Sequence, residues 1–196
     1  MKLTKERILD AARRHFARFG FRKASLSEIA AELGVVKGAL YYYVPGGKQE
    51  LFDLVLQRDL DQVLAAMRGA VEGEADPRRK LRAMADARLR VINQLKDLLG
   101  VHRDVLEELV AIIYQQPNHP YSKSERDLIE EILISGESSG LFRKIEPRAT
   151  TASAIQAAMR TLLIPALYAE AAHAAEPVAL LEPLFDLMLL GLEARP

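Results

Sequence analysis

Apolar residues recur every three or four positions along almost the whole chain, and no segment keeps the apolar–polar alternation of a half-buried strand. The pattern therefore predicts an all-α fold, which Gly and Pro residues divide into about nine helices. The first helix is expected to start after Thr4 and to end at Gly20. A capping box of Ser122 and Glu125 predicts another helix start. After the first three, the predicted helices are Gln49–Glu72, Pro77–Leu99, Val101–Gln115, Ser122–Ser139, Pro147–Ala172 and Pro177–Glu193.

The clearest local pattern lies in residues 25–44, which read SLSEIAAELGVVKGALYYYV. Ser25 and Glu28 are spaced as a capping box, which predicts a helix start. Gly34 follows as a residue that can end this helix in the left-handed conformation. The apolar stripe of the helix consists of Leu26, Ile29, Ala30 and Leu33. A second short helix follows at once, so the segment is predicted to be a helix-turn-helix.

The second helix of this pair turns Leu40 and Val44 inward, which leaves small, basic and aromatic residues facing outward. In a helix-turn-helix, the start of the second helix meets base edges in the major groove, while lysine and tyrosine side chains bond phosphates. The outward row therefore predicts contact with double-stranded DNA, the alternative being a helical hairpin whose tyrosines belong to the core. Tyr42 is the tyrosine expected to be half-buried. The outward residues are Lys37, Gly38, Ala39, Tyr41, Tyr42 and Tyr43.

Three segments near the start of the chain, KERILDAARRHFARFGF, SLSEIAAELGVVKGALYYYV and GGKQELF, carry a family resemblance. They are similar to the DNA-binding domain of the tetracycline-repressor (TetR) family of bacterial transcriptional regulators. The resemblance implies that Ser25 and Ser27 contact DNA, that the outward row apart from Tyr42 faces the groove, and that Lys48 grips a phosphate. The loop before Lys48 is one residue longer than is usual in the family. Tyr42 and Tyr43 stand where histidine is frequent, so base preference does not carry over.

Two domains are predicted, a helix-turn-helix DNA-binding domain over residues 1–47 and a larger helical domain for ligand sensing and dimerisation over residues 48–196. Residues 1–58 hold 11 Lys/Arg and 6 Asp/Glu, a net charge of +5, while residues 59–196 have a net charge of −5. A basic first domain is typical of a protein that binds phosphates. Because the helix from Gln49 begins at the boundary, we expect a rigid joint and not a flexible linker.

The last two predicted helices carry apolar or small residues on more than one face. Ala152, Ala154, Ala157 and Ala158 permit close approach in the first of them, and the second is rich in leucine. Either these faces form a four-helix interface with a second copy, or one chain buries them itself. The family resemblance implies a homodimer through these two helices, with recognition helices ~34–36 Å apart on a palindromic operator. It also implies a repressor that a small-molecule effector releases.

A basic residue interrupts the apolar face of the helix predicted from Pro77. Arg88 lies near the middle of that face, and His102 lies on the apolar stripe of the next helix, where an ordinary core or surface role is the alternative. A buried arginine needs a carboxylate or an anionic ligand. Arg88 is therefore predicted to form an internal ion pair, to extend to water, or to anchor a ligand in a mostly apolar pocket. The candidate pocket residues are Met84, Arg88, Val91, His102, Ile132 and Ser135.

Other classes of protein fit the sequence poorly. The chain has no cysteine, which excludes disulfides, thiolate zinc sites and thiol redox chemistry. Its four histidines are scattered singly and no catalytic or phosphate-binding motif occurs, so we expect no enzyme, no metal and no cofactor. No apolar run reaches the ~18 residues of a membrane span, and no secretory signal is evident, so a cytoplasmic protein without a membrane partner is expected. A helix-turn-helix scaffold that acts through protein partners is an alternative.

Overall fold

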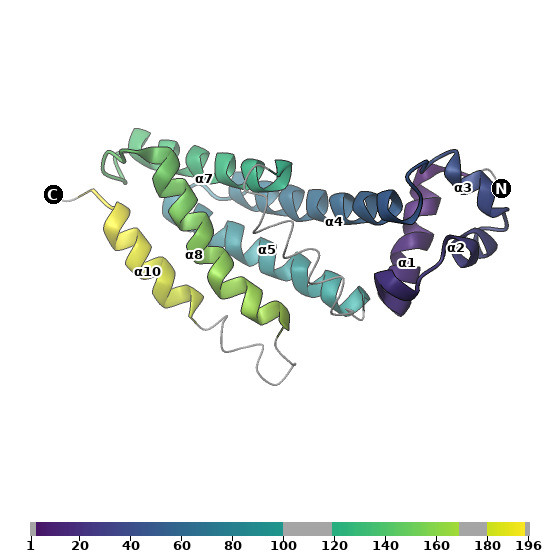
Figure 1. The fold of residues 1–196 in the computed structure, drawn as a ribbon. Helices are drawn as coiled ribbons and strands as arrows, with labels where there is room; N and C mark the ends of the chain where they lie inside the picture. Colours follow the sequence, from purple (N-terminus) through teal and green to yellow (C-terminus); the bar gives the residue numbers. More distant parts are fainter. Residues whose placement is uncertain (1–2, 100–118, 169–179, 195–196) are drawn as a thin grey trace. The chain divides into compact units, whose positions relative to one another are not determined.

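Eight helices make up the regular structure of the residues that the computed structural model describes, which are 3–99, 119–168 and 180–194 (Figure 1). The prediction of an all-α fold is confirmed, because these residues contain no strand beyond an isolated bridge between Phe142 and Glu193. The helix predicted at Val101–Gln115 lies outside the described residues. The helices are α1 (Lys5–Lys23), α2 (Leu26–Glu32), α3 (Lys37–Tyr41), α4 (Gly47–Glu72), α5 (Pro77–Leu99), α7 (Pro120–Ser138), α8 (Arg148–Tyr168) and α10 (Leu181–Leu192).

Most predicted helix boundaries agree with the structure to within a few residues. α5 has the predicted bounds, and α4 begins two residues before the predicted Gln49. α7 begins two residues before the predicted Ser122, because its N-cap is His119. The Nδ1 atom of His119 accepts a hydrogen bond from the backbone N–H of Tyr121 at 3.2 Å. The predicted capping box is therefore wrong, and Ser122 and Glu125 lie buried inside α7.

The first helical segment of α1 starts after Thr4 and ends at Gly20, as predicted. The Oγ1 atom of Thr4 accepts a hydrogen bond from the backbone N–H of Arg7 at 3.3 Å and caps the helix. Gly20 has φ 74°, which bends the chain out of the helical path, yet helical backbone resumes and reaches Lys23. Gly20 therefore ends the first helical segment as predicted, and one further helical turn follows it.

The chain divides into two compact units, the first of which contains residues 3–61 and the last residues of α5. The inward faces of α1, α2 and α3 pack there with the start of α4 around one apolar core. The rings of Phe16 and Phe52 meet edge-on with centroids 5.0 Å apart, which joins α1 to α4. The buried side chains include Ile8, Ala12, Phe16, Ile29, Leu40, Val44, Leu51 and Phe52.

The second unit contains residues 62–93 and the described residues from 119 onward. α7 and α8 lie side by side within it, and α10 follows α8 at the end of the chain (Figure 1). Arg82 of α5 forms ion pairs with Glu182 and Asp186 of α10. The buried apolar side chains of this unit include Leu81, Met84, Leu128, Ile129, Ile132, Leu133 and Met159.

Candidate nucleic-acid interface and buried charged cluster

α2 and α3 form the predicted helix-turn-helix. The Oγ atom of Ser25 accepts a hydrogen bond from the backbone N–H of Glu28 at 3.2 Å, which caps α2 as expected. Gly34 has φ 69°, in the left-handed region that favours glycine, and it lies in the turn that follows α2. The backbone N–H of Val35 donates to the carbonyl of Ala30 at 3.0 Å and closes this turn. A short backbone turn thus connects α3 to α2.

The outward surface of α3 carries several of the predicted contact residues. Lys37, Gly38 and Tyr41 are exposed, and Ala39 is half-buried. The Nζ atom of Lys37 lies 5.8 Å from the centroid of the Tyr41 ring, within the range of a cation–π contact. A Cβ atom built on Gly38 would meet no atom within 4 Å. A cation, a phenol hydroxyl and open backbone therefore lie together, and these are groups that contact phosphates and base edges.

The two following tyrosines are placed differently from the prediction. Tyr42 is 85% exposed, so the expectation that it is half-buried is wrong. Tyr43 is half-buried instead, and its hydroxyl donates a hydrogen bond to the carbonyl of Leu3 at 3.0 Å. Helical spacing explains the difference, because Tyr43 and Val44 lie three and four residues after the buried Leu40. The spacing of Tyr43 from Leu40 is visible in the sequence and indicates that Tyr43 faces the core.

Lys48 is held within the first unit. Its Nζ atom donates hydrogen bonds to the carbonyl oxygens of Phe21 and Arg22 at 2.9 and 3.2 Å. The same atom lies 4.6 Å from the centroid of the Phe21 ring. These contacts join the end of α1 to the start of α4, and no local pattern in the sequence predicts them. Of the two serines implied as DNA contacts, Ser27 is exposed and Ser25 is half-buried.

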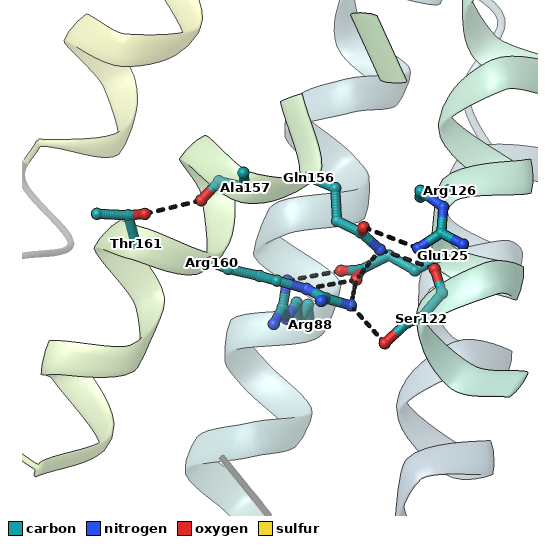
Figure 2. Close-up of polar contacts among 8 residues, drawn as sticks. All are labelled: Arg88, Ser122, Glu125, Arg126, Gln156, Ala157, Arg160 and Thr161. Carbon is teal, nitrogen blue, oxygen red and sulfur yellow. Dashed lines mark hydrogen bonds and ion pairs between the residues drawn. The ribbon is translucent and has the colours of Figure 1, made fainter. Parts of the chain in front are cut away.

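In the second unit, charged and polar side chains of α5 and α8 converge on one carboxylate of α7 (Figure 2). Arg88 Nη1 donates to Glu125 Oε1 at 2.6 Å, and both side chains are almost fully buried. Glu125 Oε2 accepts hydrogen bonds from Gln156 Nε2 at 2.7 Å and from Arg160 Nη2 at 2.6 Å. Arg160 Nη2 also lies 3.2 Å from Ser122 Oγ. Of the arrangements predicted for Arg88, the internal ion pair is the one observed.

The sequence pattern contained a signal for this cluster that the prediction missed. Glu125 lies on the apolar stripe of α7 that continues with Leu128, Ile129 and Ile132, all of which are buried. A carboxylate on such a stripe is buried with it and needs a partner. Tyr121 is buried beside these groups, and burial raises the pKa of its hydroxyl to about 12. The phenol therefore stays neutral at ordinary pH.

The other residues of the predicted pocket lie on α5 and α7 or outside the described residues. Met84 and Ile132 are buried, and Val91 and Ser135 are half-buried. His102 lies outside the described residues. Met84 precedes Arg88 by four residues, so the two lie on the same side of α5.

Neither a metal site nor a membrane span is found among the described residues. No group of three or more His, Asp or Glu side chains in these parts of the chain could hold a metal ion. None of their helices is long and apolar enough to cross a membrane.

Comparisons with known proteins agree with the helix-turn-helix. The model of a family described as bacterial regulatory proteins, tetR family, matches residues 8–55. The transcriptional repressor KstR2 of Mycobacterium tuberculosis is 27% identical over 140 residues, which are 69% of this chain and 68% of that protein. The crystal structure of PfmR, a TetR family transcriptional regulator of Thermus thermophilus, is 25% identical, with a TM-score of 0.59 over 100% of both chains. A transcriptional regulator of Cytophaga hutchinsonii shares the fold, with 19% identity and a TM-score of 0.77 over 96% of this chain and 98% of that one.

Proposed function

We propose that this chain, which belongs to the TetR family of DNA-binding transcriptional regulators, represses its target genes by binding a palindromic operator as a dimer until an effector releases it. The outward surface of α3 carries the proposal, because Lys37, Gly38 and Tyr41 are exposed where a helix-turn-helix enters the major groove. The net charge of +5 over residues 1–58 supports it. The relatives are regulators, and this chain is a regulator and not an enzyme.

The proposed DNA contacts follow from exposure and bonding. Ser27, Lys37, Tyr41 and Tyr42 are exposed and are assigned to phosphates and base edges, beside the open backbone at Gly38 and Ala39. Tyr43 and Lys48 already bond within the first unit, so we assign them to positioning α3 and the start of α4. The Oγ atom of Ser25 accepts the capping hydrogen bond of α2, which leaves its O–H group free to donate to a phosphate oxygen.

The second unit is proposed to bind the effector. Met84 and Arg88 lie one turn apart on the buried side of α5, and Ile132 and Ser135 lie on α7. Together with Val91 they are the proposed lining residues. An effector acts on DNA binding only if it binds the DNA-bound and released arrangements with different affinities.

Selection of duplexes from a random pool tests the DNA-binding proposal. We expect the 196-residue chain to enrich one roughly palindromic sequence at low salt. The Lys37→Ala variant should bind the selected duplex more weakly at every salt concentration. Its plot of log affinity against log salt should be shallower by about one unit for each copy of the contact, because a phosphate contact releases counterions.

Lys144→Ala is the matched control, since it removes a lysine that is exposed on the second unit. We expect it to bind the selected duplex as the wild type does. If no sequence is enriched, or if the two lysine variants behave alike, the assignment of α3 to the major groove is wrong. That result would support the alternative of a helix-turn-helix scaffold that acts through protein partners.

A further inference from the structure

Val36 stands out among the hydrophobic residues of the first unit. Its side chain is 76% exposed, although valine gains free energy from burial. Among residues 3–61, the large hydrophobic side chains that are exposed are Val36, Tyr41 and Tyr42. A single exposed apolar residue is ordinary on a protein surface, but here three of them lie within one short stretch of the helix-turn-helix.

Val36 also occupies a position where valine is unfavourable. It is the N-cap of α3 and makes no side-chain hydrogen bond to the helix. Thr4 and Ser25, the N-caps of α1 and α2, each accept a hydrogen bond from a backbone N–H. Serine would offer α3 the same bond, whereas valine cannot. A residue that breaks a local rule without a structural gain points to a requirement of function.

The surroundings of Val36 leave its side chain accessible. Gly38 has open space above it, and Lys37 extends over the ring of Tyr41. In a helix-turn-helix this end of the second helix meets the base edges of the major groove. The one apolar group that base pairs present in this groove is the C5-methyl group of thymine.

We propose that Val36 is a specificity-determining residue whose isopropyl group packs on the C5-methyl group of a thymine in each half-site of the operator. The inference rests on the proposed function, since it needs α3 in the major groove. Phosphate contacts of the basic first unit supply affinity without regard to sequence. Val36 adds a preference for thymine over cytosine at one base pair, because cytosine presents an amino group there and no methyl group.

Deoxyuridine provides the test, because it differs from thymidine only in lacking this methyl group. The probes are duplexes selected from a random pool by the wild-type full chain, in which each symmetric pair of thymines is replaced in turn by uracil. At one position we expect wild-type affinity to fall about fourfold per half-site, which is the loss of one buried methyl group. Other thymine positions should change little.

Two variants connect this loss to Val36. Val36→Ser should remove most of the uracil penalty at that position while raising or preserving the thermal midpoint, since serine is a good N-cap. A smaller uracil penalty in this variant therefore cannot result from unfolding. Val36→Ile keeps an apolar branched side chain and should keep the uracil penalty.

The outcomes separate this inference from the function on which it rests. If a palindrome is enriched but no thymine responds to uracil, or if Val36→Ser keeps the full penalty, the methyl contact is disproved and the proposed function stands. If no duplex is enriched at all, the proposed function fails and this contact fails with it.

Discussion

Glu125 is the residue on which the interior of the second unit depends most directly. Its two carboxylate oxygens accept hydrogen bonds from side chains of two other helices, Arg88 on α5 and both Gln156 and Arg160 on α8. Removing one partner from a buried ionic group costs far more than the intact group contributes, because the remaining charge has already lost its water. The charge on Glu125 is therefore required for the stability of this unit.

Glu125→Gln tests that requirement. The substitution keeps the size of the side chain but leaves two buried guanidinium groups facing a neutral amide. We expect the free energy of unfolding to fall by about 3–5 kcal/mol. Urea unfolding followed by circular dichroism measures the change.

Glu131→Gln is the control on the same helix. Glu131 is more than half exposed and forms a surface ion pair with Arg68 at 3.3 Å. Its loss should cost less than about 1 kcal/mol. Equal effects of the two substitutions would show that the buried carboxylate does not hold the three helices together.

At the scale of elements, α1 and α4 are joined by two ion pairs. In one pair α1 supplies the arginine and α4 the aspartate, and in the other pair the roles are reversed. Arg13 Nε lies 3.1 Å from Asp59 Oδ2, and Arg58 Nη1 lies 2.8 Å from Asp10 Oδ1. The two pairs differ in burial, because the Asp59 side chain is almost fully buried and that of Asp10 is half exposed. Burial raises the pKa of Asp59 above its ordinary value of 3.8, and the charge of Arg13 opposes this shift only in part.

The raised pKa of Asp59 predicts how stability depends on pH. Between pH 3.8 and the higher folded-state pKa, the folded protein binds more protons at this site than the unfolded chain does. The contribution of Asp59 to the free energy of unfolding is therefore greatest at low pH and declines as the pH rises through this range. We expect the difference in free energy of unfolding between wild type and Asp59→Asn to shrink in urea unfolding as the pH is raised above 3.8.

Asp10→Asn serves as the comparison, because it removes the exposed partner of the neighbouring pair. The difference in free energy of unfolding between wild type and Asp10→Asn should not decline in the same way as the pH rises. A wild-type advantage over Asp59→Asn that grows with pH would contradict a raised pKa.

Helical periodicity predicts the elements better than it predicts their polar contacts. It places α5 and the helix-turn-helix, because apolar stripes and Gly or Pro breaks are local signals. The spacing of Ser122 and Glu125 is misleading. Two residues three positions apart can form a capping box at a helix start, but they can also be side chains buried inside a helix that bond to residues distant in the sequence. Helical periodicity also leaves out the bonds from Lys48 to the end of α1, because the carbonyls that Lys48 contacts are distant in the sequence.

At the scale of the whole molecule, we propose that α8 and α10 form the interface of a dimer. Leu187 and Leu190 of α10 are 69% and 66% exposed. Ala154 and Ala157 on α8 are exposed and small, which permits close approach. A dimer through α8 and α10 would cover these residues and provide the two recognition helices that a palindrome requires.

Leu187→Asp combined with Leu190→Asp tests the dimer. A dimer would bury four such leucines, so we expect its dissociation constant to rise at least about a hundredfold. Light scattering during gel filtration measures the mass of the protein in solution. The double variant should have the mass of a monomer and a lower affinity for the selected duplex. Ile134→Asp is the control, because Ile134 is an exposed apolar residue on α7. A monomeric wild type, or an unchanged dimer in the double variant, would disprove this interface.

The charged cluster on α5, α7 and α8 also bears on how such a protein can evolve. The cluster joins two arginines to one carboxylate, so losing Glu125 alone passes through a chain whose two buried arginine charges lack their common partner. Replacing the whole set by well-packed apolar residues carries no such cost. A descendant that loses the carboxylate at position 125 is therefore expected to have lost the arginines at positions 88 and 160 as well.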